Sequence, residues 1–184
     1  MQSLEHLLLR QSHGKLTHPA PTQKQIEAMM QVALRAPDHA GLKPWRYQIF
    51  TGRSLETLAD YFVQASLAVD PTLNSKQVEK IRNKTFRAPM IVVAIANITE
   101  HKKVPKVEQI LSVGASVQNL LMAAHFSGVG AIWRSGQLCF NPRLMELLTL
   151  NENQTIVGFI YLGQEQGNKR SMVNHDQSEY VEWK

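Results

Sequence analysis

Cysteine is almost absent from this sequence of 184 residues, in which Cys139 stands alone. One cysteine cannot form an intrachain disulfide, and it cannot supply the thiolate cluster that holds a structural zinc ion. The sequence therefore predicts neither a disulfide-stabilised secreted fold nor a thiolate zinc site. A reducing, cytoplasmic location is the simplest expectation.

Long apolar runs and the common catalytic motifs are also missing. No stretch reaches the roughly 18 apolar residues that a membrane-spanning helix needs, and residues 1–6 do not resemble a secretion signal. The seven histidines show no metal-ligand spacing. Gly128-Val129-Gly130 follows a helical pattern and has Trp133 where a dinucleotide motif needs its third glycine. We therefore expect no membrane span, no metal centre and no Rossmann-type site.

Length and charge limit what remains. A chain with 43% hydrophobic content can bury a sizeable core, and no linker divides it, so residues 1–184 are expected to form one domain. Lysine and arginine number 20 against 15 acidic residues, which gives a net charge of +5. This excess favours an anionic partner, and nucleotides, nucleic acid and anionic membranes would all satisfy it.

Hydrophobic periodicity alternates between helical and strand-like along the chain. Thr22 and Gln25 have capping-box spacing, and Asn141 before Pro142 marks another helix start. Further helices are predicted over residues 4–10, 54–70 with Ser54 as cap, 75–84, and 107–126, which is apolar nearly all round and expected to be buried. Strands are predicted over residues 45–51, 88–97 and 155–162. The pattern predicts an α+β fold with a mixed sheet and the apolar run 88–97 in its middle.

One loop combines cations with an imidazole and an indole. Arg35, His39, Lys43 and Trp45 lie between a predicted helix and a predicted strand. Binding groups are often found on loops held by ordered elements, and this composition suits a charged, flat ligand. The alternative interpretation makes Trp45 a core residue and the two cations ordinary surface charges. Taken alone, the loop does not separate these interpretations.

Two further clusters combine an arginine with a hydroxyl group. They are Arg10-Gln11-Ser12 and Trp133-Arg134-Ser135. An arginine fork and a serine hydroxyl can both donate hydrogen bonds to a phosphate. The alternative is that each arginine satisfies carbonyl groups at a helix end, but occurrence together with the loop favours binding. The basic stretches 76–87 and 101–103 are interpreted as solvated faces, because their single aromatic residue, Phe86, does not make the interleaved pattern of single-strand nucleic-acid binders.

The order and spacing of four segments resemble the nitroreductase family of FMN flavoproteins, in particular its compact bacterial members. The segments are Leu8 to Ser12, Arg35 to Trp45, Gly114 to Gly130, and Trp133 to Gly136. The resemblance covers nearly the whole chain. It implies a nitroreductase-like α+β homodimer with a central mixed sheet, flanking helices and FMN at the subunit interface. One subunit would contribute Arg10, Gln11, Ser12, Trp133, Arg134 and Ser135, and its partner would contribute Arg35 and His39.

The resemblance also implies an activity. NAD(P)H would reduce the flavin and leave, and a nitroaromatic or quinone-like small molecule would then take the electrons; neither nucleic acid nor a membrane is expected as a partner. The protein would supply position and electrostatics, with no catalytic acid or base. From charge alone, Arg134 suits the phosphate and Lys15 or Arg10 the pyrimidine side of the ring. Gln11 stands where the family usually has a second arginine, which removes one positive charge.

Two other functions stay open at this stage. The first is a protein that binds or processes flavin with little reductase turnover. The second is a basic nucleic-acid-binding protein, suggested by the net charge, whose affinity would fall steeply with salt.

Overall fold

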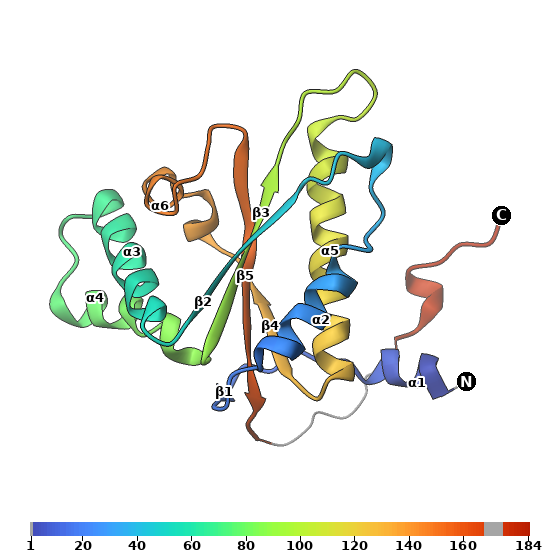
Figure 1. Ribbon diagram of the computed structural model, residues 1–184, viewed down its shortest axis with the longest axis horizontal. Coiled ribbons are helices and arrows are strands. Elements are labelled where there is room, and N and C mark those ends of the chain that lie inside the picture. The colour runs from blue at the N-terminus through green and yellow to red at the C-terminus, as the bar shows by residue number, and fades with distance from the viewer. Residues whose placement is uncertain (1, 168–174) are drawn as a thin grey trace.

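The computed structural model describes residues 2–167 and 175–184, with the backbone alone for residues 2 and 3. Its centre is a five-stranded sheet (Figure 1). The strands are β1 (Leu16–Thr17), β2 (Trp45–Thr51), β3 (Met90–Asn97), β4 (Gly130–Arg134) and β5 (Gln154–Glu165). They follow the order β1-β5-β3-β2, and β4 also pairs with β5. The apolar strand β3 therefore lies inside the sheet, as predicted, and is buried from Met90 to Ala96.

Every pairing among the described strands is antiparallel, so the prediction of a mixed sheet is wrong. β3 and β4 run in the same direction and are joined through a helix, as in a parallel unit. However, β5 lies between them, because Met90 of β3 and Ala131 of β4 both pair with Leu162. β5 therefore separates β3 from β4. If β3 and β4 were direct neighbours in the sheet, their pairing would be parallel.

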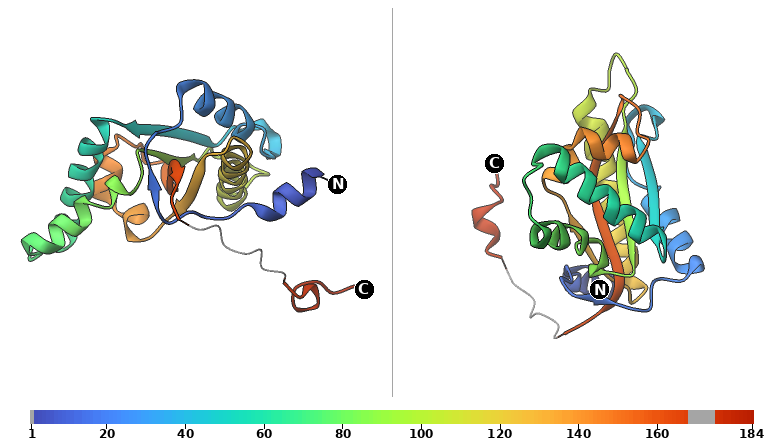
Figure 2. Two further views of the ribbon diagram at one scale, coloured as in Figure 1. Left: turned by 90° about the horizontal axis from the view of Figure 1, so that it is seen from below. Right: turned by 90° about the vertical axis from the view of Figure 1, so that its left-hand side faces the viewer.

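The helices form two layers around this sheet. The α-helices are α1 (Gln2–Leu9), α2 (Gln23–Ala33), α3 (Ser54–Val69), α4 (Ser75–Arg82), α5 (Lys106–Phe126) and α6 (Pro142–Leu147), and the 3-10 turns are η1 (His39–Gly41), η2 (Thr85–Arg87), η3 (Gln137–Phe140) and η4 (Gln177–Glu179). One core joins α2 and α5 to the sheet, and a second core joins α3, α6 and η3 to its other face (Figures 1 and 2). None of the helices in the described ranges is long and apolar enough to cross a bilayer.

Local capping chemistry explains where the helices begin. Thr22 forms the predicted capping box with Gln25, and Asn141 caps α6. Ser54 differs from its prediction, because Arg53 occupies the cap position and Ser54 is the first helical residue.

Two parts of the chain are less buried than their sequences suggest. The outer side of α5 exposes Val107 and Leu111, so the expectation of a helix buried all round is wrong for this side. Helix α1 and residues 175–184 lie to one side of the molecule (Figure 2), and α1 touches the end of α5 through His6, whose O atom is 3.0 Å from His125 Nε2. Apolar side chains in α1 are therefore left uncovered within one chain.

Candidate functional site

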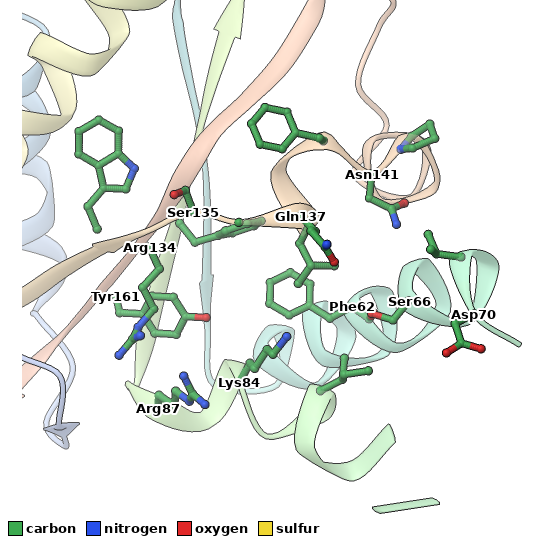
Figure 3. Close-up of a pocket in the computed structure, with 18 of the residues that line it drawn as sticks. Phe62, Ser66, Asp70, Lys84, Arg87, Arg134, Ser135, Gln137, Asn141 and Tyr161 are labelled. Carbon is green, nitrogen blue, oxygen red and sulfur yellow. The ribbon is translucent and has the colours of Figure 1, made fainter. Parts of the chain in front are cut away.

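A cavity of about 860 Å³ opens on the α3 face of the sheet, beside the end of β4 (Figure 3). Its walls come from α3, the segment between α4 and β3, and the β4–η3 connection. Apolar side chains such as Phe62 and Leu138 line one part, and the hydroxyl-bearing Tyr161 lies at the sheet. The volume is within the range of about 300–1,000 Å³ that is typical of small-molecule sites.

Three cations line this cavity: Lys84, Arg87 and Arg134. Figure 3 shows them around the ring of Tyr161, and the Arg134 Cζ atom lies 5.6 Å from the ring centroid. Within the described part of the chain, none of the three forms an ion pair with a carboxylate, and the buried Nε of Arg134 has no hydrogen-bond partner. Like charges held together without counter-ions make this wall suited to an anion.

The cavity also shifts the pKa values of two residues that line it, Lys84 and Tyr161. Burial lowers the pKa of Lys84, and the nearby charges of Arg87 and Lys80 lower it further. Burial raises the pKa of Tyr161 to about 12, although Arg134 and Arg87 oppose this shift. Tyr161 is therefore a neutral hydroxyl group at physiological pH, able to donate or accept a hydrogen bond.

Alternation along β4 places the predicted residues of this strand on different faces. Both residues line the cavity, but Arg134 lies over the ring of Tyr161, whereas the Trp133 indole lies over Gly158 of β5 and approaches Gly114 of α5. A Cβ atom built on Gly158 would overlap Trp133 Nε1 and lie 2.6 Å from Cδ1. Gly158 is thus required for the close approach of the indole. Ser135 follows β4 and lines the cavity with Arg134.

The N-terminal cluster lies alongside the same strand. His13 N donates a hydrogen bond to Ala131 O at 2.9 Å, which places the segment Arg10 to Ser12 next to β4. Arg10 and Gln11 are half-buried and Ser12 is exposed. The two clusters predicted to act together are therefore neighbours in the fold, although Arg10, Gln11 and Ser12 do not line the cavity.

Arg35 and His39 lie elsewhere. Arg35 follows α2 and is exposed, and His39 in η1 contacts Glu108 of α5 at 2.7 Å. The helices next to these residues, α2 and α5, pack on the face of the sheet opposite to α3 (Figure 1), and neither Arg35 nor His39 lines the cavity. One copy of the chain therefore does not bring them to Arg134. Trp45 is a core residue with 8% exposure, as the alternative interpretation of this loop predicts.

Sequence reasoning missed Lys84, Arg87 and Tyr161. The stretch 76–87 was expected to be a solvated face, which is wrong at its end, where Lys84 is half-buried and both cations face the cavity. These cations directly precede the buried strand β3, which is a signal that they could reach the sheet. The hydroxyl group of Tyr161 within an otherwise apolar strand was a second signal.

Comparisons with known proteins agree with the resemblance noted in the sequence. Residues 8–164 match the family model "Nitroreductase family". The chain is 37% identical over 174 residues to the "Putative NAD(P)H nitroreductase YdjA" of Escherichia coli (strain K12), which covers 95% of this chain and 94% of that protein. A "Putative NAD(P)H nitroreductase" of Haemophilus influenzae is 33% identical over 164 residues, covering 89% and 88%.

Solved structures share the fold. A nitroreductase-like family protein from Bacillus cereus has a TM-score of 0.84 at 22% identity, covering 98% of this chain and 94% of that chain. A nitroreductase with bound FMN from Bacteroides fragilis has a TM-score of 0.75 at 16% identity, covering 100% and 98%. At these identities the structural similarity identifies the fold alone.

Proposed function

The chain belongs to the nitroreductase family of oxidoreductases, and we propose that it uses FMN and NAD(P)H to reduce nitroaromatic or quinone-like acceptors. The observation that carries the proposal is the cavity wall of Lys84, Arg87 and Arg134, which has cations without carboxylate partners among the described residues. The names of the relatives and the FMN bound by a structural neighbour support the choice of cofactors.

The residues present fit a flavin mononucleotide. The phosphate of FMN is an anion, and the buried Nε of Arg134 offers a donor with no partner inside the described chain. We assign Arg134 to the phosphate and Arg10 or Lys15 to the pyrimidine side, with Gln11 and Ser12 as further donors. Trp133 and Ser135 would border the ring system. Held by these residues, FMN would supply the electron transfer from NAD(P)H to the acceptor.

The chain's own contribution would be electrostatic. The cations along the cavity stabilise negative charge on the cofactor, and low dielectric strengthens that effect. Tyr161 remains protonated, because its pKa is raised to about 12, and it can donate a hydrogen bond to the same anion. No side chain of the proposed site has to act as a general acid or base.

A homodimer is part of the proposal. In α1 the leucines Leu4, Leu7, Leu8 and Leu9 are 45–67% exposed. An isolated eight-residue helix is marginal in water, and burying each leucine would contribute about 1.5–3 kcal/mol. Trp183, at 93% exposure, is equally uncovered. A second copy that covers these side chains could also bring its Arg35 and His39 to the cofactor.

A cytoplasmic location completes the proposal. The only cysteine in the sequence, Cys139, is buried, and burial raises its pKa to about 11. A lone, protonated thiol suits a reducing compartment.

Absorbance and turnover test the function. Purified protein incubated with FMN and desalted should be yellow, and without oxygen it should turn over NADH or NADPH only when a quinone or nitroaromatic acceptor is added. Protein that stays colourless would contradict the cofactor. Yellow protein without acceptor-dependent oxidation would instead favour a flavin-binding or flavin-processing module.

A further inference from the structure

The loop between α2 and β2 is held by hydrogen bonds from its backbone to the Asp38 side chain. The Asp38 carboxylate accepts hydrogen bonds from Leu42 N at 3.1 Å and Lys43 N at 2.7 Å. Ala40 and Lys43 have φ angles of 62° and 50°, in the left-handed region that costs a non-glycine residue about 1 kcal/mol or more. Such conformations persist only where the surroundings fix them. The loop therefore presents His39 from a defined position.

A hydrogen bond links the His39 ring to α5. Its Nδ1 lies 2.7 Å from Oε2 of Glu108, which is in the first turn of the helix, where the helix dipole favours a negative charge. A carboxylate only accepts hydrogen bonds, so Nδ1 must carry the proton that it shares with Glu108. Nε2 has no hydrogen-bond partner among residues 2–167 and 175–184, and the side chain is 57% exposed. The outer edge of the ring is thus open to a ligand.

We propose that Glu108 is a positioning residue for His39, which keeps Nδ1 protonated and turns the outer edge of the ring toward FMN held mainly by a second subunit. The inference rests on the proposed function, in which His39 reaches the cofactor of the other subunit. Glu108 itself has no contact with the cofactor in this proposal and acts only through the imidazole.

Stability alone explains this pair less well. Glu108 and His39 are 45% and 57% exposed, and exposed ion pairs contribute only about 0–1 kcal/mol. The loop also has other supports, because an Arg46 guanidinium nitrogen donates to Lys43 O at 2.9 Å and to Trp45 O at 2.7 Å. Loss of Glu108 would therefore leave the loop in place and free the ring.

Glu108→Gln tests this role, because an amide can accept from a protonated Nδ1 or donate to a bare one. We expect ¹⁵N NMR of the His39 ring in the FMN-free protein to change from the Nδ1-protonated form to a mixture. The dissociation constant for FMN, from fluorescence titration of the full chain, should rise about three- to tenfold. Glu146→Gln is the matched control, because Glu146 forms a half-exposed pair with Arg143 on the other face of the sheet, and it should change neither measurement.

A double-mutant cycle separates the possible outcomes. If Glu108 acts through His39, FMN binds to the variant with both Glu108→Gln and His39→Ala no more weakly than to His39→Ala alone. Additive losses, or an unchanged His39 spectrum in Glu108→Gln, would overturn the inference. Wild-type protein that binds no FMN would instead refute the proposed function, and the two failures are therefore distinguishable.

Discussion

On the α5 face of the sheet, Val113, Val117 and Leu120 are fully buried, and two buried or half-buried polar side chains are hydrogen-bonded among them. Ser116 Oγ donates to Ala33 O at 2.7 Å, and Tyr47 OH lies 2.6 Å from the same Oγ. On the α3 face, packing is equally tight around Phe62 but stops at the cavity.

The difference shows how the fold can hold like charges together. The dense face fixes the positions of β3, β4 and β5, so the open face does not have to contribute packing everywhere. Arg134 and Lys84 can then line a cavity. Their mutual repulsion lowers stability, and the packing of the dense face offsets it. Substitutions on the dense face should affect stability, and those on the open face should affect ligand binding.

The largest expected effect is on the dense face. Leu120→Ala removes a fully buried side chain from α5 and should lower the free energy of unfolding by about 2–5 kcal/mol, measured by urea denaturation. Leu138→Ala is the matched change at the half-buried cavity wall and should cost much less. Equal losses at the two positions would remove the distinction between the faces.

Arg134→Ala should weaken FMN binding without lowering the free energy of unfolding. Charge-assisted hydrogen bonds contribute about 1.5–3 kcal/mol, so the dissociation constant for FMN should rise about 10- to 100-fold. The free energy of unfolding of the FMN-free chain should stay the same or increase, because like charges are separated. Arg143→Ala, on the exposed side of α6, is the control and should leave FMN binding unchanged. Unchanged affinity in Arg134→Ala would refute its role at the phosphate.

Gly158→Ala tests the close approach of the Trp133 indole to β5. The added Cβ would overlap the Trp133 indole, and overpacking of this kind costs about 1–3 kcal/mol. Tryptophan fluorescence should shift as the indole moves. Gly114→Ala is the matched control, because its Cβ would lie 3.8 Å from the same ring, and alanine in a helix should gain about 0.5–1 kcal/mol. A neutral Gly158→Ala would show that Trp133 can relocate freely.

The smallest effect is a pH dependence from Tyr161. The folded pKa of Tyr161, about 12, is above the unfolded value near 10. Its contribution to the free energy of unfolding is therefore complete below pH 10 and is lost as pH rises through 12. At pH 11 the loss should be about 1 kcal/mol relative to pH 8, from urea denaturation. Tyr161→Phe should lack this part of the decline. An identical pH profile in both proteins would show that the hydroxyl group is not buried as described.

Local chemistry made much of the fold predictable. The capping box of Thr22, the Asn141 cap and the strand 45–51 depend on neighbouring residues, and the structure confirms all three. β4 was not predicted, because its five residues directly follow a long helix and carry no strand alternation of their own. Its antiparallel pairing depends on β5, which is far away in the sequence.

The candidate site was predictable in part for the same reason. Arginine–serine clusters are visible in the sequence, and the fold brings the segment Arg10 to Ser12 next to β4. The sequence did not predict that Lys84 and Tyr161 lie near Arg134, because this proximity depends on how η2 packs against the sheet. The roles of Arg35 and His39 depend on a second copy and stay predictions.

The exposed leucines of α1 have a consequence for how cofactor binding depends on protein concentration. Arg10, Gln11 and Ser12 directly follow this helix, so whatever orders α1 also orders three of the proposed cofactor ligands. In a homodimer, association, folding of the N-terminal helix and loading of FMN become linked equilibria. Dilution would then release the cofactor from intact protein, and added FMN would draw separated subunits back together.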